Sequence, residues 1–574
     1  MRFGLFLWCL LYFNLGFTQS ALIPLGNPSY HMLDRIEIRS GRFFNSIHTS
    51  VKPYRRDETI KELDTLKHVL PSLSNADKFN IDYLSTDNFL ITPYDSSLSK
   101  KPLLKYFYRH KASLLSHKSK HFYFSINPVL NFSTGVQSVT IGLQPSNYSN
   151  LYINTRGAEL FGCIDDRVAF YTFVSENQMR MPAQVSQFAD STYGLPGEGY
   201  YKRFKNGVGG FDFFQARGYI HVKATNHISA QFGSDRQFIG NGYRSLIRSD
   251  FAKDNLFLRL NTNIWKINYT NVFSEFTDSA YTTGGNLYNK KYGALHHLSI
   301  NIGKNFNLGL FETVVFARTK TPGTGTYELS YLNPIIFYRA VEQNLGSPDN
   351  VMLGLDFKYN FLGHFSWYGQ FVLDELLVKY FRAQFLSKKG DPEWGWWANK
   401  YAFQTGIKYL DAFGLSNMDL QLEFNTIRPY TYTHFNVNQS YTNFNQSLAH
   451  PWGANLKEIA AIVRYQPVNR FFIEAKAFVL QTGIDSSSTE NWGGDLLKPN
   501  NKHMQDFQNF TTQGLPIKLA YAELNLSYMI RHNIFFDLNC STRNFNSSKQ
   551  KYNLSNSIVM LGARMNIASR RNDY

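Results

Sequence analysis

Alternation of apolar and polar residues with a period of two runs from about residue 121 to the end of the chain. In 353–361, leucine and aromatic residues alternate with Asp356, Lys358 and Asn360. Successive side chains of a strand point to opposite faces, so each such segment is predicted to form a strand with one apolar and one polar face. A typical segment is about 8 to 12 residues long, the length of a tilted membrane-spanning strand. Further segments of this kind are 121–132, 255–262, 420–425 and 520–539.

Strands of a soluble β-sandwich or propeller also alternate apolar and polar residues. The residue types on the two faces must therefore distinguish a soluble β fold from a membrane barrel. The polar faces carry Asn, Asp, Glu, Lys and Arg, whereas the apolar faces carry Leu, Ile, Phe and Ala. Lipid cannot solvate a charge, but a wet lumen accepts one. The pattern therefore predicts an all-β fold, a transmembrane antiparallel β-barrel of the outer-membrane type, with a secreted soluble β protein as the alternative. The mean hydropathy of -0.32 fits a barrel too, because it averages lipid-facing and wet faces.

The composition excludes disordered chains and helical membrane proteins. The 49 Phe and 36 Tyr are too many for a disordered chain. After residue 20 no apolar run is long enough for a membrane-spanning helix. Aromatic residues near the ends of the segments are typical of the interfacial girdles of barrels. We expect this position for Tyr123, Tyr269, Tyr359, Tyr401 and Tyr528.

The N-terminus predicts export. Arg2 precedes an apolar stretch, 3–17, that only Asn14 interrupts, and small or polar residues follow at 18–20. We interpret 1–20 as a cleaved signal peptide. Together with the barrel pattern, export predicts a location in the outer membrane of a Gram-negative-type bacterium. Cleavage would lower the formal net charge of +16 by one. The remaining cysteines, Cys163 and Cys540, fit two isolated thiols or one optional bridge.

Two further regions complete the organisation: 21–120 precedes the barrel, and 121–574 forms it. Apolar residues at helical spacing in 57–70 and 101–117 predict amphipathic helices, a plug or a periplasmic part, with a loop at 71–77. Short connections at 359–364 and 465–469 fit periplasmic hairpins. The long stretches 177–212, 276–291, 319–351, 386–400, 429–455 and 483–516 fit external loops or a constriction.

The sequence contains no recognisable catalytic or metal-binding pattern. There is no G-x-S-x-G elbow and no Cys/His zinc spacing, and His296 and His297 would point to opposite faces of a strand. We therefore predict no catalytic residue, no metal, no cofactor and no nucleic-acid partner. A membrane-embedded hydrolase stays as a distant alternative.

Three segments carry candidate binding residues. The first, 238–250, is rich in turns and holds Arg244, Arg248 and Asp250. The second, 331–350, contains Arg339 and Glu342. Aromatic planes beside charged groups suit sugar rings, whose C–H faces stack while their hydroxyls need polar partners. The third segment has this composition, although a packed loop with interfacial tryptophans explains it equally well. Its candidate residues are Trp394, Trp396, Trp397 and Lys400.

These segments resemble the outer-membrane capsule-assembly family called Wzi, and especially its gliding-motility relatives, the RemB-type proteins. The likeness rests on FIGNGYRSLIRSD, LNPIIFYRAVEQNLGSPDN with LGLDFKYNF, LDELLVKYF and GWWANKYAFQTGIKY, which occur in the family's order. It covers roughly 120 to 567; 21–120 resembles the family only in position, where its members carry a helical plug or periplasmic part. The matching positions, lumenal or structural in role, are Asp235, Arg236, Gly240, Gly242, Ser245, Asn333, Pro334, Tyr338, Asp349 and Asn350.

The resemblance implies a barrel of about 18 strands that acts as a surface lectin without catalytic activity. The alternating segments can be divided into about that number, but this agreement is not independent support. We therefore expect a non-enzymatic barrel that binds or anchors capsule or matrix polysaccharide, or supports gliding motility with a motility or secretion machinery. A porin-like passive channel is the main alternative. The basic charge favours acidic glycans, but lipopolysaccharide phosphates or a weakly anion-selective lumen would explain it as well.

Overall fold

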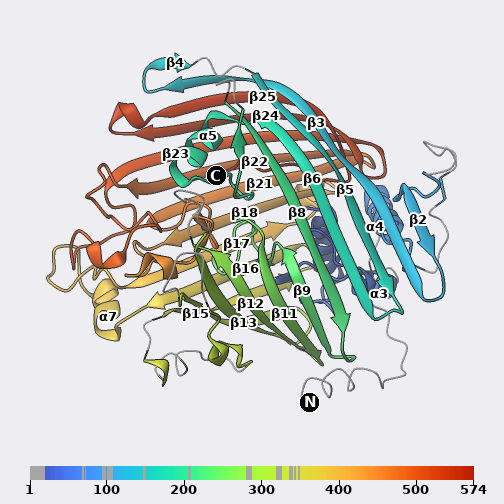
Figure 1. Ribbon diagram of the computed structural model, residues 1–574, viewed down its shortest axis with the longest axis horizontal. Helices are drawn as coiled ribbons and strands as arrows, with labels where there is room; N and C mark the ends of the chain where they lie inside the picture. Colours follow the sequence, from blue (N-terminus) through green and yellow to red (C-terminus); the bar gives the residue numbers. More distant parts are fainter. Residues whose placement is uncertain are drawn as a thin grey trace.

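The computed structural model describes residues 20–66, 70, 73–92, 98–99, 108–146, 150–204, 209–278, 288–318, 326–334, 341, 344–346 and 349–574. Within these residues, eighteen antiparallel strands close into a barrel, which confirms the predicted fold (Figure 1). The barrel closes where the last strand pairs with the first, from Met565 opposite Leu130 to Leu554 opposite Ile141. Its strands, in order, are β3 (Phe122–Ile141), β5 (Asn150–Ile164), β6 (Val168–Arg180), β8 (Gly210–Lys223), β9 (Ile228–Asp235), β11 (Asn255–Ile264), β12 (Ile267–Thr277), β13 (Lys290–Ile302), β14 (Phe306–Phe316), β15 (Asn350–Phe361), β16 (Phe365–Glu375), β17 (Lys400–Tyr409), β18 (Met418–Ile427), β21 (Leu456–Val468), β22 (Phe471–Ile484), β23 (Leu515–Arg531), β24 (Ile534–Ser547) and β25 (Leu554–Met565).

Small elements join or flank these strands. The helices are α2 (Ser29–Ser40), α3 (Arg56–Leu66), α4 (Asn75–Asp87), α5 (Ala183–Thr192) and α7 (Val378–Leu386). The short strands are β1 (Val51–Lys52), β2 (Leu115–Lys118), β4 (Gln144–Ser146), β7 (Lys202–Arg203), β10 (Phe238–Ile239), β19 (Thr442–Asn443) and β20 (Gln446–Ser447). Single 3-10 turns are η1 (Leu329–Leu332), η2 (Ala412–Gly414), η3 (Val437–Gln439), η4 (Asn500–Lys502) and η5 (Gln550–Tyr552). Among the described helices, none is both long and apolar enough to cross a membrane.

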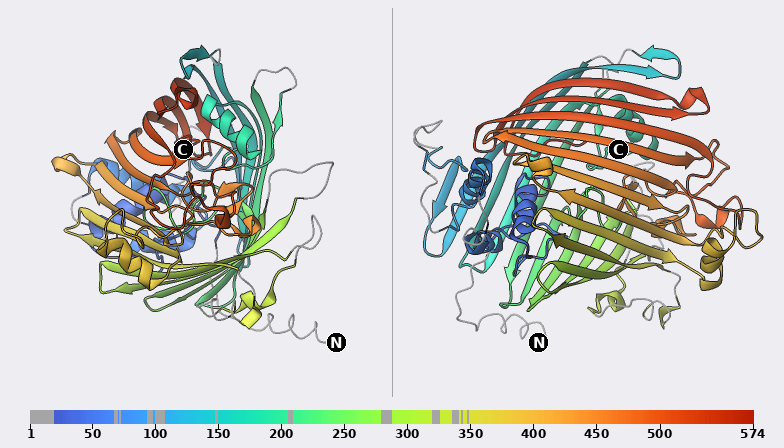
Figure 2. Two further views of the ribbon diagram at one scale, coloured as in Figure 1. Left: turned by 90° about the vertical axis from the view of Figure 1, so that its left-hand side faces the viewer. Right: turned by 180° about the vertical axis from the view of Figure 1, so that it is seen from behind.

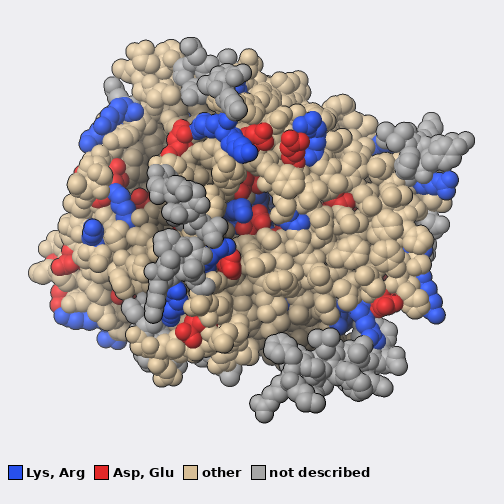
Figure 3. Space-filling view, in the orientation of Figure 1, with Lys and Arg blue, Asp and Glu red and all other residues tan. Residues whose placement is uncertain are grey.

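The predicted faces of the strands are confirmed. In β15, Asp356, Lys358 and Asn360 are almost fully buried on the lumenal side, whereas Leu353 and Tyr359 are exposed on the outside. On the side shown in Figure 3, the surface over β5, β6 and β8 carries few charged side chains, and charges gather along the edges and around a hollow. This distribution is the one that a lipid-facing wall requires.

One girdle prediction is wrong. Tyr123 is only 7% exposed and packs in a lumenal cluster with Leu22, Phe161 and Tyr171. It shares the inner face of β3 with the polar residue Ser125, so the alternation of that strand directs it away from lipid. Tyr359 and Tyr528, by contrast, are exposed on the outer wall, at 37% and 49%.

Short turns lie at one end of the barrel and long connections at the other. Residues 165–167, 265–266, 303–305, 362–364 and 532–533 make tight turns. At the opposite end, the connections 181–209, 278–289, 317–349, 376–399, 428–455 and 485–514 agree with the predicted long loops. The connection 236–254 is a seventh, and it folds into the lumen behind β9, which is only 8 residues long.

Helices α2, α3 and α4 close the end with the short turns, at the right of Figure 1. Their apolar residues form one core that includes Met529 and Phe535 of the barrel wall. Arg35 of α2 bonds to Asp411 and Asp419 at the β17–β18 turn, and Tyr83 of α4 donates to Asn533 at the β23–β24 turn. These three helices, called the plug below, are thus bonded to the barrel wall at this end.

The predicted helix boundaries need two corrections. The interval 71–77 is not wholly loop, because α4 begins at Asn75 behind a capping box in which Ser74 and Asp77 bond each other's backbone N–H groups. The helix predicted at 101–117 is wrong at its end, since β2 (Leu115–Lys118) pairs there with β3. Residues 100–107 lie outside the described part of the chain, as does nearly all of the predicted signal peptide.

Segments of the chain fill much of the lumen. Strands β1 and β10 pair inside it and join the plug to the 236–254 segment. An apolar core of the lumen combines Leu246 and Ile247 of that segment with Leu448 and Tyr432 of the long connections. The chain end also lies inside the ring of strands, as the left view of Figure 2 shows. Cys163 and Cys540 are both free, so the optional disulfide does not form.

Candidate functional site

The first motif, 238–250, lies inside the barrel as a tightly bonded segment. Arg244 is 5% exposed, and its guanidinium reaches Glu458 at 3.1 Å and the backbone oxygen of Asp573 at 2.7 Å. Arg248 donates to Asn255 at 2.5 Å and lies over the ring of Phe276. Both arginines are therefore engaged by the protein, which favours a role in packing the lumen; their assignment to glycan binding stays a prediction.

Other members of this motif shape its backbone. The hydroxyl of Ser245 donates to the Ile239 carbonyl and accepts the N–H groups of Ile247 and Arg248. At Gly240, where φ is +142°, a Cβ would lie 2.5 Å from Gln370 Nε2 on the wall. The positive φ favours glycine, and a side chain here would displace the Gln370 amide, which donates to the Ile239 carbonyl and accepts the N–H of Leu246. Gly242 likewise lies against Glu423.

The second motif lies at the wall, around a buried carboxylate. Asp349 accepts two bonds from Arg318, at 2.7 and 2.8 Å, and one from the hydroxyl of Tyr331 at 2.7 Å. Asn350 donates to the Gln439 carbonyl at 2.9 Å, which ties the start of β15 to a long connection. These contacts indicate a structural role.

Other positions of that motif lie elsewhere or cannot be placed. Asn333 follows η1 directly, and the carbonyl of Pro334 accepts the hydroxyl of Tyr269 on the outer face of β12. Three candidates of this motif, Tyr338, Arg339 and Glu342, lie outside the described residues.

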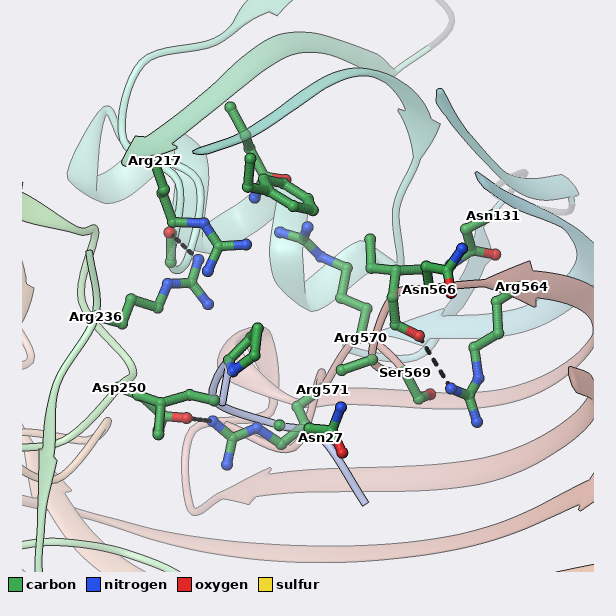
Figure 4. A pocket seen from close by; sticks show the side chains of 18 of the residues that line it. Asn27, Asn131, Arg217, Arg236, Asp250, Arg564, Asn566, Ser569, Arg570 and Arg571 are labelled. Atoms are coloured by element: carbon green, nitrogen blue, oxygen red, sulfur yellow. Dashed lines mark hydrogen bonds and ion pairs between the residues drawn. The ribbon is translucent and has the colours of Figure 1, made fainter. Parts of the chain in front are cut away.

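An arginine-lined cavity of about 220 Å³ lies within the lumen (Figure 4). In Figure 4, Arg217, Arg236 and Arg570 direct their guanidinium groups toward the same space. The cavity's charged lining residues, among those described, are seven arginines, Arg56, Arg217, Arg236, Arg244, Arg564, Arg570 and Arg571, and five acids, Asp87, Glu159, Glu198, Asp250 and Asp573. The excess of positive charge favours an anionic occupant.

Ion pairs occupy part of this lining. Glu198 bonds Arg236 at 3.3 Å and Arg570 at 3.1 Å. Burial tends to raise the pKa of Asp250, but Arg571, 2.5 Å away, outweighs burial and lowers it. Asp235, the remaining motif position, pairs with Arg217 at 3.7 Å and accepts the backbone N–H of Arg236.

Two arginine Nε–H groups beside the cavity are available as hydrogen-bond donors. The Nε atoms of Arg217 and Arg236 are buried and have no hydrogen-bond acceptor among the described protein atoms. An anion in the cavity would satisfy such donors through charge-assisted bonds. The cavity can therefore hold a small anionic group.

The third segment lies far from this cavity, at the end with the long connections. Loop 387–399 packs on loop 500–510: the N–H of Trp397 donates to Asp506, and that of Gln508 to Trp394, both at 2.8 Å. Gly395, at φ +68°, permits the contact, since a Cβ there would lie 2.6 Å from the Asn509 carbonyl oxygen. The two loops thus form one fixed surface.

The tryptophans of this surface differ in what covers them. Trp397 stacks on His503 with 4.2 Å between ring centroids, and Trp396 packs on Tyr380 at 4.8 Å. Trp394 is partly exposed, and no ring of the described residues contacts it. Lys400 is buried at 1% exposure and pairs with Glu375 at 2.8 Å. All three tryptophans are partly exposed, and among the described residues Trp394 is the one whose ring faces are not covered by another ring.

Comparison with known proteins gives similarity at the level of the fold. No protein-family model and no curated protein matches the sequence. The solved structure of Wzi from Escherichia coli, described as an outer-membrane protein involved in group 1 capsule assembly and a carbohydrate-binding β-barrel, superposes with a TM-score of 0.55 at 13% identity. That match covers 96% of this chain and 100% of Wzi. OprD from Pseudomonas aeruginosa matches with a TM-score of 0.40 at 10% identity, over 77% of this chain and 95% of that one.

Several residues of the cavity were not predicted from the sequence. Arg217 lies on the inner face of β8, and Arg564, Arg570 and Arg571 lie at or after the end of β25. The alternation in β8 could have identified Arg217 as lumenal, because it shares a face with Phe213 and Tyr219. Nothing local in the sequence shows that the residues after β25 turn back into the barrel.

Proposed function

We propose that this protein is a non-enzymatic outer-membrane β-barrel that binds surface polysaccharide through its long external loops. The filled lumen is the observation that carries the proposal. Helices α2–α4 close one end, and the 236–254 segment builds an apolar core inside. A passive channel needs a continuous wet path, which a packed core interrupts. Wzi, which has a similar fold, is described as carbohydrate-binding, and this supports the proposal.

The surface formed by loops 387–399 and 500–510 has the chemistry of a sugar site. Trp394 offers a partly exposed ring, and Phe510 is 37% exposed with the Lys389 ammonium 4.2 Å from its ring centroid. Sugar C–H faces stack on such rings, and lysine attracts glycan carboxylates or phosphates. Because backbone bonds between the loops hold this surface, little ordering is needed on binding.

The biological role of such binding divides into capsule retention and gliding. The sequence resemblance to capsule-assembly proteins and their gliding-motility relatives supports both. A deletion strain scored for bound capsule and for gliding separates the two roles. We expect loss of one of them, and a strain that keeps both would contradict the proposal.

The binding test uses the purified full-length protein on a glycan array that contains neutral and acidic bacterial polysaccharides. We expect binding, and W394A should weaken it about tenfold, since one stacking contact is lost. The matched control is W265A, because Trp265 is 74% exposed in a short turn at the opposite end. Absence of binding by the wild type, or equal losses in both variants, would refute the proposal.

Single-channel recording in planar bilayers tests the porin alternative. A filled barrel should be nearly silent. Steady porin-sized conductance by the wild-type protein would favour the channel instead.

A further inference from the structure

Helix α7 lies on the outer side of the barrel wall, at the end with the long connections (Figures 1 and 2). Phe381 packs against Tyr401 of β17, with 5.8 Å between ring centroids, and Tyr401 in turn contacts Phe371 of β16. Both strand residues belong to the outward faces of their strands. On its other side, Tyr380 packs on Trp396. The helix is therefore fixed against the wall from outside.

The height of α7 matches the edge of a membrane. Phe365 begins β16 near the short turns, and Leu377, which caps α7, comes 12 residues later. At about 3.3 Å per residue and a strand tilt of about 40°, the distance along the barrel axis is roughly 30 Å. The apolar band of an outer-membrane barrel is about 25 Å tall. The helix thus begins where hydrocarbon gives way to lipid headgroups.

Its free face is apolar to an unusual degree for an exposed helix. No residue of α7 is buried. Val378 is 60% exposed, Phe385 65% and Leu386 83%, and Leu377 just before the helix is 50% exposed. In water such a patch is unfavourable, whereas acyl chains would cover it.

Basic residues adjoin this face. Arg382 lies between Val378 and Phe385 at i, i+4 and i+7 spacing, and Lys388 and Lys389 follow the helix. All three are exposed, and no ion-pair partner of Arg382 or Lys388 occurs among the residues that the structure describes. Lys379 differs, because it pairs with Glu393.

We propose that α7 and the lysines after it form a docking site for the lipid A part of lipopolysaccharide. The acyl chains cover Leu377, Val378, Phe385 and Leu386, and Arg382, Lys388 and Lys389 bind the phosphates. An amphipathic helix at headgroup level with basic residues beside an apolar face suits an anionic amphiphile of this kind. The inference rests on the outer-membrane location proposed above.

Binding of fluorescent diphosphoryl lipid A to the full-length protein, refolded in detergent free of lipopolysaccharide, tests this site. The variant R382E/K388E/K389E should bind roughly tenfold to a hundredfold more weakly and lose the preference over lipid A without phosphates. The variant V378S/F385S/L386S should weaken binding of both forms alike. The control K118E/K120E, in an exposed segment at the opposite end, should bind within about twofold of the wild type.

Heat-modifiable migration on gels reports whether each variant folds. If R382E/K388E/K389E does not fold, the neutral variant R382Q/K388Q/K389Q takes its place. A charge variant that keeps the wild-type preference for phosphates would overturn the docking site, as would an equal loss in the control. Cell fractionation separates the two proposals. A protein absent from the outer-membrane fraction refutes the location, whereas unchanged binding by the variants of a correctly located protein refutes the docking site alone.

Discussion

Replacing Arg35 with methionine should release the plug from the barrel. Arg35 is 4% exposed, and its three nitrogens bond three carboxylates: Asp77 of α4 at 3.0 Å, and Asp411 and Asp419 of the β17–β18 turn at 2.5 Å each. One side chain thus joins two helices to the wall. Methionine keeps most of the apolar stem and removes the charge.

The stability cost of R35M depends on which ion-pair partners the three carboxylates retain. Asp77 keeps Arg39 at 2.5 Å, Asp419 keeps His31 at 3.0 Å, and Asp411 keeps Arg39 at 3.7 Å, so each of the three carboxylates retains a partner. Removing one partner of a buried ion pair costs about 3–5 kcal/mol of stability. Because the carboxylates keep other partners, we expect R35M to cost about 3 kcal/mol. Since about 1.4 kcal/mol is a factor of ten, the released plug should become roughly a hundredfold more populated.

Thiol labelling measures this population. Ile38 on α2 is fully buried, so a cysteine there reacts only when the helix leaves its site. In a background without Cys163 and Cys540, I38C should be labelled about a hundred times faster when R35M is present. Labelling at an unchanged rate would refute the reasoning. The control is K78M, an exposed position on α4, which should change the rate by less than a factor of about three.

Three other substitutions test the filled lumen, with urea midpoints from heat-modifiable gel migration as the measurement. R244M should cost about 3 kcal/mol, because it removes the cation bonded to Glu458, and a midpoint equal to the wild type would contradict the packing role. F257A, at 2% exposure in the lumenal core, should cost about 3–5 kcal/mol, clearly more than F232A on the lipid face; equal losses would argue against the core. Burial lowers the pKa of Lys52 to about 7. The unfolded chain then binds more protons between about pH 7 and 10, so stability should rise with pH across that window and K52M should remove the rise.

The sequence predicts those features that depend on the alternation of residues within one strand. It does not predict contacts between residues that lie far apart in the chain. The inner position of Lys358 follows from alternation in one strand, but its bond to Asp34 at 2.8 Å joins residues 324 positions apart. Tyr123 shows the limit of reasoning from position alone, since the alternation of its own strand already directed it inward. A capping box at Ser74 could have revealed α4, whose polar sequence otherwise resembles a loop.

The candidate residues were harder to interpret than the fold for a physical reason. Aromatic and charged side chains in a loop can contact a ligand or one another, and both cases have the same composition. Trp397 stacks on His503, more than a hundred positions later, so its face is used within the protein. Among the candidate tryptophans, all partly exposed, Trp394 is the one that no other ring of the described residues covers.

Charges on the inner wall distinguish a lumen that holds the N-terminal helices from an open channel. In a wet channel, lysines of the lumenal face would stay hydrated, and burying them alone would be costly. Here Lys358 is 1% exposed and Lys408 14%, and both bond Asp34 of α2. These two lumenal lysines thus share a matching charge on α2, which fixes where that helix sits and which way it faces. Such pairs contribute little net stability when both partners are present, but they strongly disfavour a misplaced plug, because a displaced helix leaves charges buried and unpaired. The polar faces that the alternation predicts therefore hold the protein's own inserted segments, both the N-terminal helices and the 236–254 segment.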